Sequence, residues 1–228
     1  MSNKDKNKDF LKPYIILASL YVTLLVSCSV YLNKLVGTDQ LFVTGAALPF
    51  PFALIILDII AEIYGYKRAR TVIWTGFFCL MLFVTLTHFL IYLPSPHFSG
   101  SVTAYSEIFK NTESASLSWV IAGITGDFIN AYALSKWKVL LKGRFFWLRS
   151  VGASAIGQAI YSFSWIMIIY AGHYGIHGSL TIIFAIYIYK MFLIAILAIP
   201  CTFLILLIKK TSKIDIYDYS TNFNPFKI

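Results

Sequence analysis

The chain has 228 residues, of which 58% are hydrophobic and only 13% are charged, and its formal net charge is +9. A soluble domain is typically about 45–50% apolar and about 25% charged. Together with a mean hydropathy of +0.74, the composition therefore indicates a membrane protein. It excludes a disordered chain, a disulfide-rich secreted fold and a nucleic-acid-binding domain.

Apolar stretches predict an all-α membrane protein with six transmembrane helices. These stretches cover residues 14–32, 43–64, 71–93, 116–134, 151–171 and 180–208. At about 20 residues per crossing, they use roughly 120 residues. The first stretch lacks a small-x-small cleavage site, which favours an uncleaved span over a signal peptide. The loop at 94–115 is predicted to carry a short interfacial helix near 105–109. The chain thus divides into a basic tail over 1–12, a six-helix domain over 13–210 and a C-terminal tail over 211–228.

The distribution of basic residues predicts the orientation. Sixteen of the 19 Lys and Arg residues lie in the two tails and in the loops after the second and fourth spans. The opposite side carries only Lys34 and Lys110. Because Lys and Arg concentrate in cytoplasmic loops, both termini are expected in the cytoplasm. This bias accounts for the basic charge without a nucleic-acid partner.

Ionisable residues inside the spans are the candidate functional residues, because a charge in the bilayer normally faces a cavity or a partner. Asp58 and Glu62 are four residues apart and project from one helical face. Asp127 lies in the fourth span and Lys190 in the sixth. Lys190 is expected to meet one of the three carboxylates, either in a binding site or as a structural ion pair. Glu62 has an alternative place at the cytoplasmic end, paired with Arg68 or Arg70.

The start of the second span is predicted to be distorted. Pro49 and Pro51 cannot both lie in a regular helix interior. Free backbone groups are tolerated in a bilayer only where they face protein or a water-filled cavity, and broken helices often build transporter sites.

Small residues open the fifth span, over residues 152–158. Such a face lets helices approach closely, either in a homodimer contact or in an interior seam. His173 and His177 lie in a glycine-punctuated turn without a third ligand, so no metal site is expected. The cysteines form no CxxC pair and are expected to be small core residues.

Several motifs together resemble the queuosine precursor transporters, a bacterial family of the vitamin-uptake-transporter type. The matching stretches are Pro49-Phe50-Pro51-Phe52, Asp58 to Arg70, Gly126-Asp127-Phe128-Ile129-Asn130, Gly143 to Arg149, and Lys190 followed by Pro200. The resemblance implies a six-helix importer of the bacterial inner membrane. Its substrates would be planar bases, 7-cyano- or 7-aminomethyl-7-deazaguanine, which supply tRNA modification. It implies no cofactor.

The resemblance also implies roles for individual residues. Carboxylates would accept hydrogen bonds from the N1–H and 2-amino group of the base, amides would read its carbonyl and remaining edge, and aromatic rings would stack on it. Lys190 would balance the carboxylates or contact the 6-oxo group. The candidate carboxylates are Asp58, Glu62 and Asp127, the candidate amides are Asn130 and Gln158, and the candidate stacking rings are Phe52 and Trp165.

One motif departs from the family. Where the family often has Gly-Glu-x-x-Asp-Ser, this chain has Gly157-Gln158-Ala159-Ile160-Tyr161-Ser162. The loss of two carboxylates removes a partner for a cationic aminomethyl group and favours a neutral ligand.

Two other functions compete with a self-sufficient facilitator or ion-coupled carrier. One is the substrate-binding subunit of an ATP-driven energy-coupling-factor-type transporter for vitamins or nucleobases. The first span offers little of the small-residue docking face that such a subunit needs. The other is an intramembrane enzyme, but the sequence has no Gly-x-Ser-x-Gly and no His-Glu-x-x-His motif.

Overall fold

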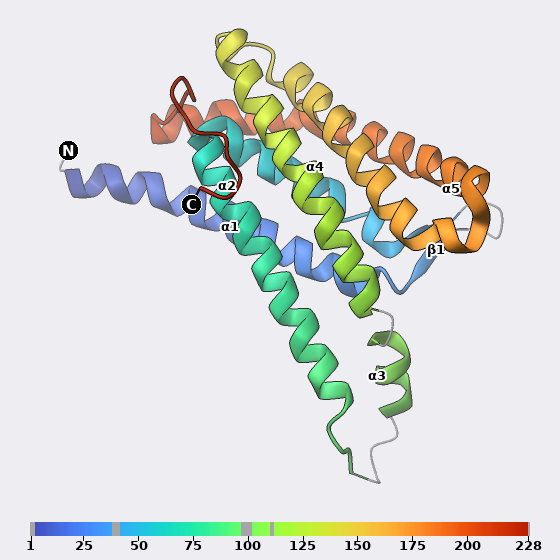
Figure 1. Ribbon diagram of the computed structural model, residues 1–228. Helices are drawn as coiled ribbons and strands as arrows, with labels where there is room; N and C mark the ends of the chain where they lie inside the picture. The colour runs from blue at the N-terminus through green and yellow to red at the C-terminus, as the bar shows by residue number, and fades with distance from the viewer. Residues whose placement is uncertain (1–2, 38–41, 97–101, 110–111, 228) are drawn as a thin grey trace.

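The computed structural model describes residues 3–37, 42–96, 102–109 and 112–227. The chain is helical apart from one short antiparallel hairpin (Figure 1). Its elements are α1 (Asn3–Tyr31), β1 (Leu35–Gly37), β2 (Phe42–Thr44), the 3₁₀ helix η1 (Gly45–Ala47), α2 (Phe50–Ile91), α3 (Val102–Phe109), α4 (Thr112–Leu140) and α5 (Phe146–Ser212). The short helix predicted near residues 105–109 is therefore present as α3.

The helices have the composition of membrane spans. Within the described residues, three helical stretches are long and apolar enough to cross a bilayer: Leu11–Tyr31, Gly45–Ile91 and Ile186–Ser212. Large apolar side chains point outward from them, among them Phe78 on α2 and Phe203 on α5, each 69% exposed. Exposed apolar surface on this scale marks a membrane-facing protein. The chain is an all-α membrane protein.

Helix α2 reverses direction at Gly65. The backbone there has φ 79° and ψ 170°, in the positive-φ region that only glycine adopts without strain. This one residue separates a first arm, residues 50–64, from a second arm, residues 66–91. A loop was expected between the second and third spans, but Arg68 and Arg70 already belong to the second arm, because one glycine is enough to turn the chain.

Helix α4 packs between the two arms of α2. From the N-terminal to the C-terminal end of α4, its contacts with the first arm move to higher residue numbers in α2. Its contacts with the second arm move to lower residue numbers in α2. These contacts are Trp119 with Phe50 and Asn130 with Asp58 on the first arm, and Gly123 with Phe77 and Phe128 with Trp74 on the second. The two arms are therefore antiparallel.

Helix α5 also doubles back. Both Arg149, near its start, and Lys209, near its end, contact the carboxylate of Glu62. A straight helix would separate them by about 90 Å. Figure 1 shows the reversal at the right-hand side, in orange. We call residues 146–165 the first arm of α5 and residues 186–212 its second arm.

The first arm of α2 is the centre of the fold. Nearly all its residues are buried, as expected for a helix that is hydrophobic all round. Helix α1 packs beside α2 through a stripe that includes Tyr21 and Leu25. Gly76 permits this contact, because a Cβ atom there would lie 2.7 Å from the ring of Tyr21.

The small residues of α5 form an interior seam with α4. A Cβ atom on Gly157 would lie 2.7 Å from the carbonyl oxygen of Gly126 and 2.9 Å from Cβ of Asn130. A Cβ atom on Gly152 would lie 2.8 Å from the ring of Trp137. The glycines of the 152–158 face thus serve packing within the chain.

The predicted distortion near Pro49 and Pro51 falls at the beginning of α2. The 3₁₀ helix η1 precedes it, Pro49 is the N-cap and Pro51 lies in the first turn. Proline is tolerated there because the N–H groups of a first helical turn lack partners within the helix.

Candidate functional site

A small cavity lies where the start of the first α2 arm meets α1, α4 and both arms of α5. Its volume is about 40 Å³. Its walls are mainly aromatic and small residues, namely Leu32, Thr44, Ala46, Ala47, Phe50, Trp119, Tyr161, Trp165, Ile186 and Lys190. Within the described part of the chain, Lys190 is the one charged residue that lines it.

Lys190 is held by an amide and two aromatic rings. Its Nζ donates to Oε1 of Gln158 at 3.3 Å and lies 4.0 Å from the ring centroid of Tyr161 and 4.7 Å from that of Phe50. Cation–π contacts of this kind strengthen when the cation is desolvated, and Lys190 is only 5% exposed. Because an ammonium has three N–H groups and one is used here, it retains hydrogen-bonding capacity.

Asp127 is the carboxylate that acts electrostatically on Lys190. No ion pair within 4 Å joins the two in the described part of the chain. The hydroxyl of Tyr21 donates to Oδ2 of Asp127 at 3.0 Å, whereas the buried Oδ1 accepts no hydrogen bond. The buried Nε2 of Gln158 also has no hydrogen-bond partner. Such buried polar groups are rare in native structures, so Oδ1 of Asp127 can serve a ligand as an acceptor and Nε2 of Gln158 as a donor.

A second polar group lies deeper along the first α2 arm and surrounds Asp58. Its Oδ1 accepts from Nδ2 of Asn130 at 2.6 Å, and its Oδ2 accepts from the hydroxyl of Ser150. The hydroxyl of Ser154 donates to Oδ1 of Asn130 at 3.4 Å. Because Asp58 is fully buried and both its oxygens are bonded, it mainly joins α2 to α4 and α5.

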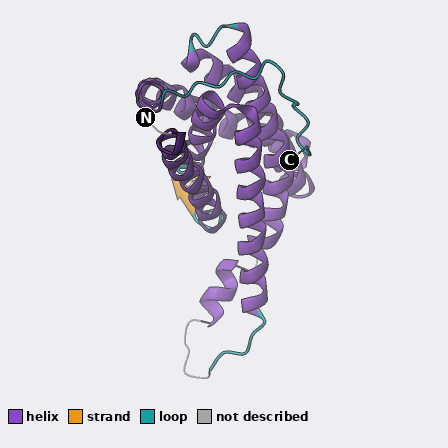
Figure 2. Cartoon of the chain, turned by 90° about the vertical axis from the view of Figure 1, so that its left-hand side faces the viewer, coloured by secondary structure: helices purple, strands orange, loops and turns teal. Residues whose placement is uncertain are grey.

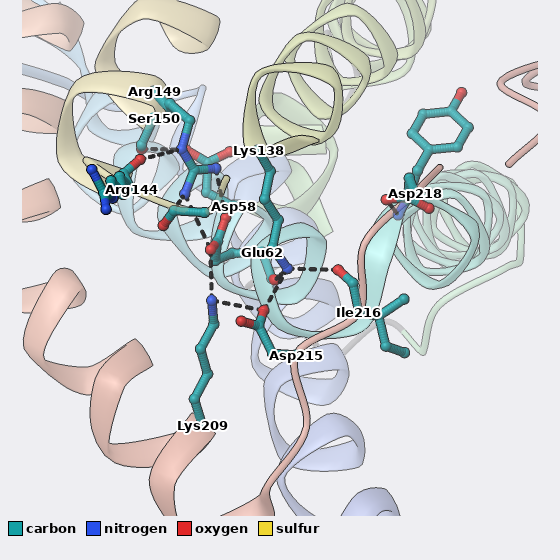
Figure 3. Close-up of polar contacts among 12 residues, drawn as sticks. Asp58, Glu62, Lys138, Arg144, Arg149, Ser150, Lys209, Asp215, Ile216 and Asp218 are labelled. Carbon is teal, nitrogen blue, oxygen red and sulfur yellow. Dashed lines mark hydrogen bonds and ion pairs between the residues drawn. The ribbon is translucent and has the colours of Figure 1, made fainter. Parts of the chain in front are cut away.

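Glu62 lies at the far end of the same arm, in a group of charges shown in Figure 3. Arg149 binds its carboxylate through both terminal nitrogens, at 2.8 and 3.2 Å, and Lys209 binds it at 2.7 Å. Glu62 and Arg149 are each 1% exposed. The alternative pairing with Arg68 or Arg70 is wrong, because Arg149 and Lys209 bind Glu62 and Arg70 donates to backbone carbonyls of the C-terminal tail.

The C-terminal tail completes this group. Asp215 accepts from Lys138 at 2.6 Å and from Lys209 at 2.8 Å. Partial burial alone would raise the pKa of Asp215, but the hydrogen bonds and positive charges of these two lysines outweigh it and hold that pKa below its ordinary value. We call Glu62, Lys138, Arg149, Lys209 and Asp215 the ionic cluster.

The structure separates the predicted site residues into three places. Trp165 and Lys190 line the cavity, Gln158 binds Lys190, and Asp127 acts on Lys190 electrostatically. Asp58 and Asn130 lie deeper, and Glu62 belongs to the ionic cluster. Phe52 was expected to stack on a ligand, but it is 49% exposed and does not line the cavity. Phe50 lines the cavity instead. Phe52 lies two residues further along α2, where the turn of the helix directs its side chain away from the cavity.

Sequence reasoning missed most of the ionic cluster and several cavity walls. By sequence alone, Lys138 and Lys209 are only part of the cytoplasmic charge bias, and Arg149 is part of that bias and of the motif from Gly143 to Arg149. Asp215 carried no clear signal, because the tail over 211–228 holds two acidic and two basic residues.

The structure assigns no role to the histidine pair. His173 and His177 fall among residues whose side chains lie outside the described part of the chain. Among the described residues, no group of three or more His, Cys, Asp or Glu could hold a metal ion.

Comparison with known proteins places these features in a family. Residues 44–205 match the family described as "Putative vitamin uptake transporter". A relative from Bacillus subtilis (strain 168), named "Probable queuosine precursor transporter", is 25% identical over 144 residues, which are 63% of this chain and 62% of the relative. The chain thus aligns with less than two thirds of that relative's length. No solved structure matches the chain.

Proposed function

The chain belongs to the vitamin uptake transporter family, and from this premise we propose that it imports a queuosine precursor across the bacterial inner membrane. The ligand is a 7-deazaguanine base, which the cell uses for tRNA modification. The proposal takes the substrate class from the name of the Bacillus subtilis relative and the site from the geometry around Lys190.

The observation that carries the proposal is a lysine with spare hydrogen-bonding capacity in an aromatic cavity. Phe50, Tyr161 and Trp165 supply flat apolar surfaces for a planar base. Lys190 suits the 6-oxo group as a charged donor, and the open Oδ1 of Asp127 suits the N1–H or 2-amino group as a charged acceptor. An acceptor beside two donors on one flat edge is the pattern of guanine-like bases in general, and the 7-deaza class comes from the name of the relative.

The cavity must widen before a base can enter. Its volume of about 40 Å³ compares with the roughly 30 Å³ share of one liquid water molecule, whereas ligand pockets usually enclose about 300–1,000 Å³. The structure therefore represents a contracted form of the site. Binding has to separate the walls contributed by η1, α4 and the two arms of α5.

The charge of the cavity favours a neutral ligand. Lys190 is the one charged residue lining it in the described part of the chain, and its immediate partners, Gln158 and Tyr161, carry no negative charge. A cationic aminomethyl group would meet the lysine on the cavity wall, and the nearby Asp127 carboxylate is already assigned to the N1–H or 2-amino group of the base. We therefore propose 7-cyano-7-deazaguanine as the better substrate and the aminomethyl base as the poorer one.

The proposed orientation has six crossings with both termini in the cytoplasm. The two reversals, in α2 and α5, supply the additional crossings. Phe50, at the cavity, and Glu62, in the ionic cluster, are separated along α2 by about 18 Å. With the termini in the cytoplasm, the cavity lies toward the outer face and the ionic cluster toward the cytoplasm.

The test is uptake by a bacterium that can neither make queuosine precursors nor import them. This chain is expressed alone, each deazaguanine is supplied at low concentration, and queuosine in tRNA is measured. We expect modification to be restored, with the 7-cyano base effective at lower concentration. The proposal fails if a chain shown to be in the membrane restores no modification with any of the bases.

A further inference from the structure

The C-terminal tail lies across the end of the fold that holds the ionic cluster. We call residues 213–227 the strap. Figure 2 shows it as a long loop running over the helix ends to the C-terminus. In Figure 1 it passes beside the reversal of α2. Because it follows α5 directly, the strap links the second arm of α5 to α2.

The strap is bound to both arms of α2 by specific hydrogen bonds. The N–H of Ile216 donates to the carbonyl oxygen of Ile63 at 3.1 Å, and the N–H of Tyr66 donates to Oδ2 of Asp218 at 2.9 Å. Further along, Nε1 of Trp74 donates to the carbonyl oxygen of Pro225 at 2.8 Å. The strap is thus seated on α2 over a length of ten residues.

Two glycines make room for the strap. A Cβ atom on Gly65 would lie 3.1 Å from Ile216 and 3.2 Å from the carboxylate of Asp218. A Cβ atom on Gly143, in the turn between α4 and α5, would lie 2.2 Å from the hydroxyl of Tyr217. Both turns at this end of the fold therefore have glycine where the strap approaches most closely.

We propose that the ionic cluster and the strap form a gate on the cytoplasmic side, and that the second arm of α5 moves away together with the strap when the gate opens. This inference rests on the proposed function, because a gate matters only in a chain that carries a substrate across the membrane. The Glu62 carboxylate is then a gating group and not a ligand of the substrate.

Glu62 binds one residue from each arm of α5, and the difference between these two partners indicates which arm moves. Arg149 holds Glu62 through two hydrogen bonds, and its side chain is 0% exposed. Lys209 holds the same carboxylate through one nitrogen and is 17% exposed. If Lys209 leaves, Glu62 keeps a buried counter-ion, so no charge is left unpaired in the interior. Lys209 reaches water easily from its partly exposed position.

The strap provides the lock on this movement. Asp215 binds Lys209 on the moving arm and Lys138 on α4, and it is 38% exposed. Lys138 also donates to the carbonyl oxygens of Glu62 and Ile216. Lys138 therefore keeps one partner on α2 after the strap has left. Among the contacts that must break, the ion pair of Asp215 with Lys209 lies at the rim of the cluster, where water can replace it, whereas the hydrogen bond from Tyr66 to Asp218 is buried.

The test measures the access of a membrane-impermeant thiol reagent to cysteines on either side of the gate. The reporter behind the gate is Ser154→Cys, which is 1% exposed, and the reporter at the cavity is Ala47→Cys. The three native cysteines are first replaced by alanine. The gate is weakened with Asp215→Asn or by ending the chain at Lys213, and Glu107→Gln, an exposed site on α3, is the matched control.

In Asp215→Asn we expect labelling of Ser154→Cys from the cytoplasmic side to become about fivefold faster or more, as loss of two rim ion pairs predicts. Labelling of Ala47→Cys from outside should slow at the same time, because an open cytoplasmic gate favours a closed outer side. The chain ending at Lys213 should show a larger change in both reporters, and Glu107→Gln should show none.

The proposal is overturned if Asp215→Asn labels at the wild-type rates, or if both reporters become faster together, which would indicate general loosening. Asp215→Asn keeps the size of a partly exposed side chain, so it decides the matter even if the shortened chain does not fold. The assay needs no substrate. Normal gating without uptake would therefore contradict the proposed substrate and leave the gate intact.

Discussion

Replacing Arg149 with methionine should be among the most destabilising single changes in this chain. The guanidinium of Arg149 is buried, binds Glu62 at 2.8 and 3.2 Å, and donates to the carbonyl oxygens of Gly143 and Arg144. Methionine fills similar space without a charge or donor. Glu62 would then depend on Lys209 alone, and two carbonyl groups of the α4–α5 turn would lose their partner.

The expected cost follows from the burial of the pair. Removing one partner of a buried ion pair typically destabilises a protein by about 3–5 kcal/mol. For a chain of 150–250 residues, each kcal/mol lowers Tm by about 2–4 °C. Arg149→Met should therefore lower Tm by about 6–20 °C. Arg144→Met is the matched control, because Arg144 is exposed and surface substitutions usually stay within about 0.5 kcal/mol.

The assay is thermal unfolding of the purified protein in detergent micelles, followed by near-ultraviolet circular dichroism. Glu62→Gln and the double variant complete a double-mutant cycle. We expect the double variant to lose less stability than the two single variants combined, with a coupling of about 0.5–3 kcal/mol. A Tm for Arg149→Met within about 2 °C of the wild type would refute this account of the Glu62 pair.

Three further predictions concern the cavity, the strap and the α2 reversal. Lys190→Met should lower deazaguanine uptake at least tenfold while the exposed control Lys210→Met does not, measured at equal membrane abundance; equal uptake would remove Lys190 from the site. The pKa of Asp215 is lowered in the folded chain. The stability that its ion pairs contribute is therefore present above the unfolded pKa of about 3.9 and is lost as the pH falls through the lower pKa of the folded state. The mobility of a spin label on Tyr219→Cys should thus stay constant from pH 8 to 5 and rise only below the unfolded pKa value; a rise between pH 7 and 5 would contradict this. Gly65→Ala should cost about 1–3 kcal/mol from the positive-φ backbone at this residue alone, and an unchanged Tm would mean that the α2 reversal tolerates a side chain.

Sequence analysis predicted the parts of this fold that depend on local composition. The apolar stretches identified an all-α membrane protein, and the polar loop at 94–115 was correctly expected to carry a short helix, α3. The small residues around Gly157 were recognised as a contact face. Their partner, Gly126, was not predicted, because close approach between two helices depends on tertiary packing.

The contacts that define the site could not be predicted, since they join residues distant in the sequence. The alternative interpretation of Glu62 paired it with arginines six and eight residues away, whereas its partners lie 87 and 147 residues away. Lys190 was expected to bind a carboxylate and instead donates to Gln158. The strap has no apolar periodicity, so the sequence showed only a polar tail.

The central claim is that this chain alone carries a neutral deazaguanine through the Lys190 cavity. Its most direct test is uptake of radiolabelled 7-cyano-7-deazaguanine into liposomes that contain only the purified protein, with Lys190→Met liposomes measured in parallel. The account predicts saturable uptake by the wild-type protein and uptake near that of empty liposomes for the variant. Equal uptake by both proteins, or none by a correctly folded wild type, would contradict it.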